Sequence, residues 1–194
     1  MKTLRVQSGD YKGRIIPAIT TNQNKENFTP SLLKKTIFSI IEDLHLKGNL
    51  EKAKTTFVDL FAGSGQMGIE AISRGFLKSV LFEIDQKRFT AFTRGIGLDY
   101  KEKVVLFRRD SFRYYKSALN DSEEFMVFFA DPPYSFWDNN RSELKSLADS
   151  IISMKEKKSL LIFQSPMNPD WKNFESRKYG NHYLIIHSWL NSSV

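Results

Sequence analysis

The chain is 194 residues long, enough for one domain with a substantial apolar core. Its 29 lysines and arginines outnumber its 22 aspartates and glutamates, and the formal net charge of +7 favours a polyanionic partner. No cysteine is present, which excludes disulfides and thiolate chemistry, and no apolar run reaches membrane-spanning length, so we expect a cytoplasmic protein without a membrane partner.

The N-terminal quarter of the chain predicts a small arm followed by a helix. Short apolar stretches flank glycine-containing turns between residues 4 and 17, which is typical of a hairpin. Residues 18–28 are polar without periodicity and predict a loop. Thr29 and Pro30 then predict a helix start, with threonine as N-cap and proline at the first helical position, and apolar spacing extends this helix to about Leu46.

From residue 55 onward, strands alternate with helices. Strands are predicted at residues 56–61, 79–82, 104–107, 125–130 and 159–163. Helices are predicted after Gly65, from residue 86, and at residues 111–119 and 141–154. The chain then ends in a predicted antiparallel hairpin, residues 174–179 and 182–189. This order predicts an α/β doubly wound sheet in residues 55–194, with residues 1–54 as an N-terminal hairpin and helix extension.

A glycine turn follows the first of these strands. Gly63, Gly65 and Gly68 fit the pattern G-x-G-x-x-G, which suits a dinucleotide and a methyl donor equally well. Asp59 stands just before the glycines, where its charge would oppose a pyrophosphate but attract a sulfonium and an α-ammonium group. We therefore favour S-adenosylmethionine, which carries both cations, over the nucleotide of an oxidoreductase.

Acids after the next two strands complete the predicted cofactor site. Glu83 ends the second strand, where its carboxylate can accept hydrogen bonds from both ribose hydroxyls. Asp110 follows the third strand and can accept from the adenine amino group, with the backbone of Ser111 nearby, although an aspartate here equally suits a helix cap. The predicted cofactor-binding residues are Asp59, Phe61, Gly63, Gly65, Glu83, Asp110 and Ser111.

The motif Asp131-Pro132-Pro133-Tyr134 follows the fully apolar fourth strand and predicts a pocket for a planar amine. The lone pair of a base amino group is delocalised into the ring, so methylation needs the nitrogen pyramidalised. The Asp131 carboxylate and the Pro132 carbonyl can do this by accepting both N–H groups, and Tyr134 offers a face on which an extruded base can stack. Positioning and electrostatics would then supply most of the rate.

Basic residues gather in two stretches of the sequence. Residues 1–55 hold ten lysines and arginines against five acids, and residues 87–116 hold nine against three. Such surfaces neutralise phosphates and bind nucleic acid in a salt-sensitive way. We predict Arg5, Lys12 and Arg14 in the arm as RNA-binding residues. The three histidines stand on different elements, so no metal site is expected.

These motifs resemble those of the RsmD-type bacterial methyltransferases, which modify a guanine N2 amino group of small-subunit ribosomal RNA. The resemblance covers residues 4–190. It rests on the arm motif Gly9-x-x-Lys12-Gly13-Arg14, on the glycine turn with its tail Glu70-Ala71-x-Ser73-Arg74-Gly75, and on Asp131-Pro132-Pro133-Tyr134. It implies a class I S-adenosylmethionine-dependent methyltransferase fold, Rossmann-like, with a seven-stranded, mostly parallel sheet whose last strand is antiparallel.

The same resemblance implies S-adenosyl-L-methionine as cofactor and ribosomal RNA as partner, either free or within a small-subunit assembly intermediate. Two departures from the family pattern stand out. The pattern Arg-Pro-Thr-x-Asp-Arg is replaced by Asn-Phe-Thr-Pro-Ser-Leu at residues 27–32, without its charges, and Arg94-Gly95 stands near a position where members tend to carry asparagine.

Two alternatives to guanine-N2 methylation follow from the same residues. Methylation of adenine N6 or cytosine N4 in DNA or RNA uses the same amine chemistry, although 194 residues leave little room for a separate DNA-recognition domain. The altered 27–32 segment also suits a non-catalytic RNA-binding or assembly factor on this fold. The intact Asp131, Gly63 and Gly65 argue against that second alternative.

Overall fold

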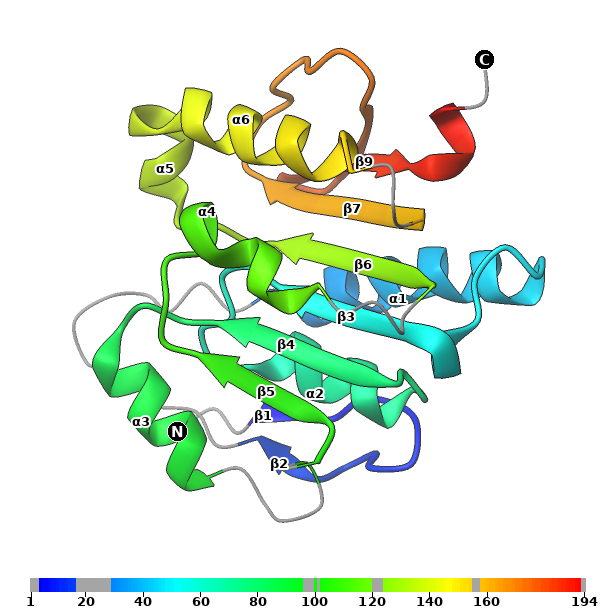
Figure 1. Ribbon diagram of the computed structural model, residues 1–194, viewed down its shortest axis with the longest axis vertical. Helices are drawn as coiled ribbons and strands as arrows, with labels where there is room; N and C mark the ends of the chain where they lie inside the picture. The colour runs from blue at the N-terminus through cyan, green and yellow to red at the C-terminus, as the bar shows by residue number, and fades with distance from the viewer. Residues whose placement is uncertain are drawn as a thin grey trace.

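Seven strands form one sheet at the centre of the molecule (Figure 1). The computed structural model describes residues 4–16, 29–95, 100, 102–119, 124–154 and 158–192. In spatial order the strands are β5 (Val104–Phe107), β4 (Lys78–Phe82), β3 (Thr55–Asp59), β6 (Phe125–Ala130), β7 (Lys158–Ser165), β9 (His182–Ser188) and β8 (Glu175–Tyr179). Strand β9 is antiparallel to both of its neighbours, and the other pairings are parallel, which confirms the predicted sheet.

Helices cover both faces of this sheet, with α1 and α2 behind it and α4 and α6 in front in the view of Figure 1. The first layer consists of α1 (Ser31–Leu46), α2 (Gln66–Ser73) and α3 (Gln86–Gly95), and the second of α4 (Ser111–Tyr114), α5 (Tyr134–Asn139) and α6 (Arg141–Ile152). The short 3-10 turns η1 (Lys52–Lys54), η3 (Tyr115–Ala118) and η4 (Trp189–Ser192) join or end some of these elements. The described helices are all too short or too polar to cross a membrane.

The central strands are buried on both faces because each face carries its own apolar layer. Successive side chains of a strand point to opposite sides of a sheet. Phe57 of β3 accordingly stacks on Phe38 of α1, with ring centroids 5.9 Å apart, and belongs to the same cluster as Phe129. Val58 and Phe128 belong to the cluster on the other face, with Leu144 of α6. All six residues of β6 are buried, which explains its uninterrupted apolar sequence.

The structure differs from the sequence-based prediction around three elements. Helix α1 begins at Ser31, and Pro30 rather than Thr29 is its N-cap, so the predicted threonine cap is wrong. The helix predicted at residues 111–119 is a short α4 followed by η3. Helix α5 was not predicted and starts directly after Pro133, because proline suits the entrance of a helix as well as the end of a strand. The predicted loop at residues 18–28 lies outside the described residues.

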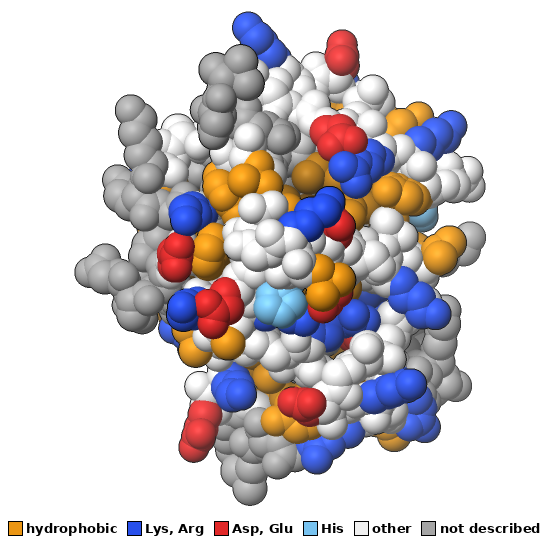
Figure 2. Space-filling view, turned by 90° about the vertical axis from the view of Figure 1, so that its right-hand side faces the viewer, with side chains coloured by type: hydrophobic (Ala, Val, Ile, Leu, Met, Phe, Trp, Pro, Cys, Tyr) orange, Lys and Arg blue, Asp and Glu red, His pale blue; other side chains and the backbone are white. Residues whose placement is uncertain are grey.

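The parallel strands all start on one side of the molecule, and Figure 2 views that side. Basic and acidic side chains are interspersed over it rather than gathered into a patch of one sign. Several exposed ion pairs near the strand starts contribute to this pattern, including Lys54–Glu51 before β3 and Lys158–Glu124 between β7 and β6. Pairs of this kind balance the charge but add little stability, typically ~0–1 kcal/mol each.

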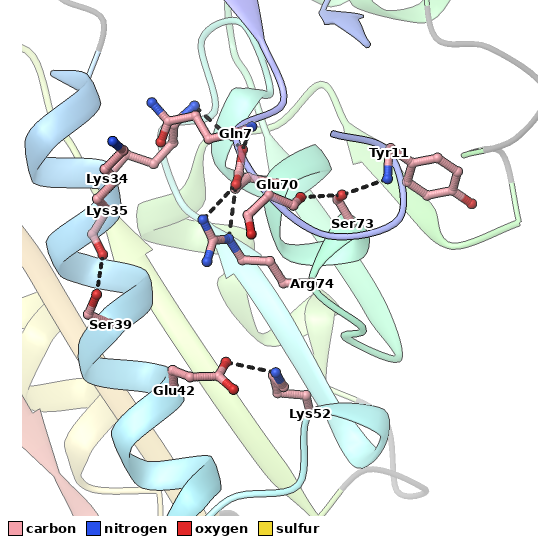
Figure 3. Close-up of polar contacts among 11 residues, drawn as sticks. Gln7, Tyr11, Lys34, Lys35, Ser39, Glu42, Lys52, Glu70, Ser73 and Arg74 are labelled. Carbon is pink, nitrogen blue, oxygen red and sulfur yellow. Dashed lines mark hydrogen bonds and ion pairs between the residues drawn. The ribbon is translucent and has the colours of Figure 1, made fainter. Parts of the chain in front are cut away.

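The N-terminal arm is a hairpin of β1 (Leu4–Arg5) and β2 (Ile15–Ile16) that docks on the end of α2 (Figure 3). The Ser73 hydroxyl donates to the Ser8 carbonyl at 2.5 Å and accepts from the backbone N–H of Tyr11 at 3.0 Å. The approach is so close that a Cβ on Gly9 would lie 1.7 Å from the Ser73 carbonyl oxygen. A glycine is therefore required at this position, where φ is +83°.

Candidate active site

A cavity of about 1110 Å³ opens at the carboxyl ends of the parallel strands. Strands β3 and β6 end beside each other there, at the point where the order of the strands reverses, which is where open α/β sheets bind their ligands. The glycine turn after β3 and the Asp131-Pro132-Pro133-Tyr134 turn after β6 therefore share one cavity. The predicted site residues that line it are Asp59, Phe61, Gly63, Glu83, Asp110, Ser111, Asp131, Pro132 and Tyr134.

The two predicted cofactor glycines occupy different positions in their turn. Gly63 lines the cavity, and its φ of +54° lies in the left-handed region. Gly65 is not among the cavity-lining residues, so its predicted direct contact with the cofactor has no support from the cavity. A Cβ on Gly65 would instead lie 2.1 Å from the ring of Phe92 on α3. The absence of a side chain at Gly65 leaves room for Phe92, which forms part of the cavity wall.

Glu83 holds the glycine turn in place from the end of β4. Its Oε2 accepts a hydrogen bond from the backbone N–H of Gly63 at 2.9 Å, and its Oε1 accepts one from Asp85 at 2.7 Å. Burial raises the pKa of Glu83, and these two hydrogen bonds oppose that rise. Each carboxylate oxygen has a second lone pair, so Glu83 can still accept hydrogen bonds from a ligand hydroxyl.

Asp59 forms the most deeply buried acidic part of the cavity. It is 1% exposed, and its Oδ1 accepts a hydrogen bond from the backbone N–H of Phe61 at 3.2 Å. Burial, helped by the nearby charges of Asp131 and Glu83, raises the pKa of Asp59 to about 8, and the hydrogen bond from Phe61 opposes that rise. Across the described parts of the chain, none of these three acids forms an ion pair with a lysine, arginine or histidine within 4 Å.

This arrangement fits S-adenosylmethionine better than a dinucleotide. Asp59 and Glu83 line the cavity without a lysine, arginine or histidine partner within 4 Å among the described residues, so they favour a ligand with positive charge and oppose a pyrophosphate. The open side of Gly63, where an added Cβ would meet no atom within 4 Å, leaves room for a ligand to approach the backbone. The residues present therefore suit a cofactor with a sulfonium and an α-ammonium group.

Asp131 and its neighbours form the second half of the cavity. Thr29, which is 6% exposed, donates a hydrogen bond from its Oγ1 to Asp131 Oδ2 at 2.9 Å. Burial raises the pKa of Asp131 to about 7, and the Thr29 hydroxyl opposes that rise. Pro132 is buried, whereas Tyr134 is 38% exposed and its hydroxyl lies 3.4 Å from Nδ1 of His182. The exposed ring of Tyr134 thus stands where a planar ligand could reach it.

The wall beside Asp110 is aromatic. Asp110 caps α4, since its carboxylate accepts the backbone N–H of Phe112 at 3.0 Å, and it lines the cavity as well. The ring of Phe61 packs edge-on against Phe112 and Phe136, with centroid distances of 5.8 and 6.0 Å. Asp110 is therefore a helix cap that also lines the cavity, and the buried Ser111 follows it at the start of α4.

The predicted RNA-binding residues of the arm do not line this cavity. Arg5 donates from Nη1 to the Gly13 carbonyl at 2.8 Å, and the Arg14 guanidinium lies 4.8 Å from the centre of the Tyr11 ring. Lys12, Arg5 and Arg14 are exposed. All three remain candidates for contact with RNA at a distance from the cavity.

Sequence reasoning missed several cavity residues that bear polar or charged groups, and four of them bear on the proposals below. They are Thr29, Arg88, Arg109 and Arg113. The excess of basic residues at 87–116 was visible in the sequence, but it did not indicate which arginines face the cavity. Thr29 could not be found from its neighbours, because its partner Asp131 lies 102 residues away. The described residues contain no cluster of three or more side chains suited to hold a metal.

Comparison with known proteins identifies relatives over most of the chain. YlbH of Bacillus subtilis strain 168, named as a proposed rRNA methyltransferase, is 30% identical over 154 residues, which are 79% of this chain and 78% of that protein. The ribosomal RNA small subunit methyltransferase D of Buchnera aphidicola from Baizongia pistaciae is 30% identical over 133 residues, 68% of this chain and 62% of that protein.

Solved structures share the fold at lower identity. A hypothetical protein from Thermus thermophilus matches with a TM-score of 0.70 and 23% identity, covering 95% of this chain and 99% of that one. The N-terminal domain of human METTL16, solved in complex with SAH, matches with a TM-score of 0.63 and 13% identity, covering 87% of this chain and 75% of that one. The fold is therefore that of the class I methyltransferases.

One family model spans nearly the whole chain. It is described as "Conserved hypothetical protein 95" and matches residues 4–188, which include the arm, the glycine turn and the Asp131-Pro132-Pro133-Tyr134 turn. The match runs from the first described strand, β1, to the end of β9. The chain thus belongs to this family, the RsmD-type methyltransferases.

Proposed function

We propose that this protein is an S-adenosyl-L-methionine-dependent methyltransferase that acts on an exocyclic amino group of a base, the N2 of guanine in small-subunit ribosomal RNA. The observation that carries this proposal is the shared cavity, in which unpaired acids lie beside an Asp-Pro-Pro-Tyr turn. The names of the relatives support ribosomal RNA as the substrate class. The finer choice of guanine N2 rests on the motif resemblance, and the reaction would take place in the cytoplasm.

The proposed roles follow from the position of each residue. Asp59 and Glu83, with Gly63 between them, would hold the cationic and hydroxyl groups of the cofactor, and Asp110 with Ser111 would face its adenine. S-adenosyl-L-methionine, when bound, supplies a methyl group on a positively charged sulfur. Phe61 would contribute to the aromatic wall that excludes water from this end of the cavity.

The Asp131 carboxylate would hold the base amino group by accepting one of its N–H bonds, and the Pro132 carbonyl would accept the other. Two acceptors pull the nitrogen toward a pyramidal geometry and direct its lone pair toward the methyl donor. Burial raises the pKa of Asp131 to about 7, which also suits it to take up the proton that the nitrogen loses on methylation. Tyr134 would stack on the extruded base.

The binding surface for RNA would combine two basic regions. Arg88, Arg109 and Arg113 line the cavity and are exposed, so they can meet phosphates beside the extruded nucleotide. The arm, with Arg5, Lys12 and Arg14, would add contacts farther away, which gives residues 1–54 a role in RNA binding. We expect Arg109→Ala to weaken RNA binding. The slope of the logarithm of the binding constant against the logarithm of the salt concentration should fall by the amount that corresponds to about one phosphate contact.

Filter binding at several salt concentrations measures this effect. Arg177→Ala is the matched control, because Arg177 is also exposed but pairs with Glu175 on β8, outside the cavity lining. If Arg109→Ala leaves the salt dependence of binding unchanged, the cavity arginines do not contact phosphates.

The test of the proposed function is methyl transfer from labelled S-adenosylmethionine to 30S subunits, naked ribosomal RNA and DNA, followed by nucleoside analysis. We expect label in N2-methylguanosine. Label in N6-methyladenosine or N4-methylcytidine would mean that the protein methylates a base amino group, as proposed, but that the base is not guanine. Absence of label on all three substrates, with the cofactor bound, would contradict the proposal and favour a non-catalytic role.

A further inference from the structure

The hydroxyl of Thr29 connects the N-terminal extension to the proposed catalytic carboxylate. Thr29 Oγ1 donates to Asp131 Oδ2 at 2.9 Å, across 102 residues of sequence. Thr29 is 6% exposed and lines the cavity, so its hydroxyl and the carboxylate meet at the cavity wall. The segment that precedes α1 therefore reaches the same site as the turn after β6.

The local sequence explains why this hydroxyl is free for such a contact. A residue before proline is disfavoured in the helical region, so Pro30 keeps Thr29 out of α1. Pro30 itself caps the helix without a side-chain hydrogen bond, and its carbonyl accepts the backbone N–H of Lys34 at 2.9 Å. The Thr29 side chain is thus not engaged in capping, and a buried hydroxyl needs a partner elsewhere.

We propose that Thr29 is a positioning residue of the active site, which orients the Asp131 carboxylate toward the amino group of the base. This inference rests on the proposed function. The Thr29 hydroxyl occupies Oδ2, and among the described residues Oδ1 has no hydrogen-bond donor. Oδ1 is therefore left for the substrate, and a carboxylate fixed through one oxygen presents the other in a defined direction.

The same hydrogen bond influences the protonation of Asp131. A hydroxyl that donates to a carboxylate favours its ionised form, which is the form that can accept an N–H. The surroundings act in the opposite direction, because burial raises the pKa of Asp131. The other titratable or charged groups that line the same cavity are Asp59 on β3, Glu83 and Asp85 after β4, Arg88 on α3, Arg109 and Asp110 before α4, Arg113 on α4, Tyr134 on α5 and Glu143 on α6.

The experiment compares methyl transfer by wild type, Thr29→Val and Thr29→Ser on whichever of 30S subunits or ribosomal RNA the wild type methylates. Valine keeps the branched shape and removes the hydroxyl, whereas serine keeps the hydroxyl. Thr36→Val is the matched control, since the Thr36 hydroxyl donates only within α1, to the Leu32 carbonyl at 3.1 Å. Thr29→Ala replaces the valine variant if valine prevents folding.

We expect Thr29→Val to lower kcat roughly 10- to 100-fold at pH 7, while KM for RNA and the Kd for S-adenosylmethionine change less than about twofold. The acidic limb of its pH–rate profile should move to higher pH, and Thr29→Ser should restore both rate and profile. Wild-type activity of Thr29→Val, an unmoved profile, or failure of serine to rescue would each overturn the inference. If the wild type itself methylates no substrate, the proposed function fails instead.

Discussion

Buried carboxylates in two regions of this protein, the base of the arm and the cavity, differ in whether cationic side chains pair with them. Glu70 of α2, at the base of the arm, is 0% exposed and pairs with two cations, Arg74 at 2.8 Å and Lys34 of α1 at 3.6 Å (Figure 3). Its Oε2 also accepts the backbone N–H of Gln7 at 2.8 Å. Asp59, at the cavity floor, is equally buried but accepts only a backbone N–H among the described contacts.

The difference separates buried charges that stabilise the fold from buried charges that are available to bind a ligand. Glu70 links the arm, α1 and α2, and Arg74 also lies over the ring of Phe38 on α1, so the cluster is satisfied without any ligand. The cavity acids Asp59, Glu83 and Asp131 have no cationic partner within 4 Å among the described side chains. Their burial therefore lowers the free energy of unfolding until a cationic ligand binds. Functional sites commonly carry such perturbed groups, while structural ion pairs are complete within the protein.

The largest effect should come from breaking the balanced cluster. Glu70→Gln removes the only acid that pairs with Lys34 in the described structure, and it leaves two cations buried or half-buried beside each other. We expect a loss of about 3–5 kcal/mol in the free energy of unfolding and a fall in Tm of roughly 10 °C or more. Thermal unfolding measures both quantities.

Glu42→Gln is the matched control for this variant. Glu42 pairs with Lys52 at 2.7 Å, but its side chain is 40% exposed, so its removal should cost only ~0–1 kcal/mol (Figure 3). Equal effects of the two substitutions would mean that burial does not distinguish the Glu70 cluster from an ordinary surface pair.

A substitution in the cavity should lower kcat without lowering the free energy of unfolding. We expect Asp131→Ala to lower kcat by ~10²–10³-fold, because the base amino group loses its charged acceptor. The Kd for S-adenosylmethionine should stay close to that of the wild type, as measured by calorimetry. A large loss of cofactor affinity with normal turnover would instead assign Asp131 to the cofactor.

Replacing the most buried unbalanced acid should stabilise the protein without ligand. Asp59→Asn removes a charge that burial disfavours, and the asparagine oxygen can still accept the Phe61 N–H. We expect a gain of roughly 1–2 kcal/mol near pH 8 together with weaker binding of S-adenosylmethionine. Loss of stability in the ligand-free variant would show that Asp59 supports the fold, as Glu70 does.

The raised pKa values also predict a difference in the pH dependence of stability. The ordinary pKa of an aspartate is 3.8, and burial raises that of Asp59 to about 8 and that of Asp131 to about 7. Between these limits the folded state holds protons that the unfolded state has released, so stability falls as pH rises from about 4 to 8. Urea unfolding should give a flatter profile for Asp59→Asn than for wild type. Parallel profiles would contradict the raised pKa.

The order of strands and helices could be predicted from the sequence because each element carries its own local signal. The apolar run at 125–130 gave β6 with its observed ends, and the glycine turn was placed between β3 and α2 as found. The predicted N-cap of α1, Thr29, was wrong. A threonine before a proline fits the local pattern of a helix cap, but that pattern does not take distant partners into account. The hydroxyl prefers a partner from a distant part of the chain, which no local rule describes.

The site was predictable to the extent that its residues follow strands in a known topology. Asp59, Glu83 and Asp131 each end or follow a parallel strand, so the fold itself brings them to one edge. Gly65 shows the limit of a motif, since its spacing is that of a cofactor glycine but its missing side chain makes room for Phe92. Two partners of Glu70, Gln7 and Lys34, come from the arm and α1, and sequence spacing does not reveal these two contacts.

The most direct test of the central claim is calorimetric titration of S-adenosylmethionine at pH 7 in two buffers of different ionisation enthalpy. A cation that enters beside Asp59 lowers its pKa, so binding should release protons, and Asp59→Asn should release fewer. Binding without proton release, or with the same release in the variant, would contradict the account that unbalanced acids form the cofactor site.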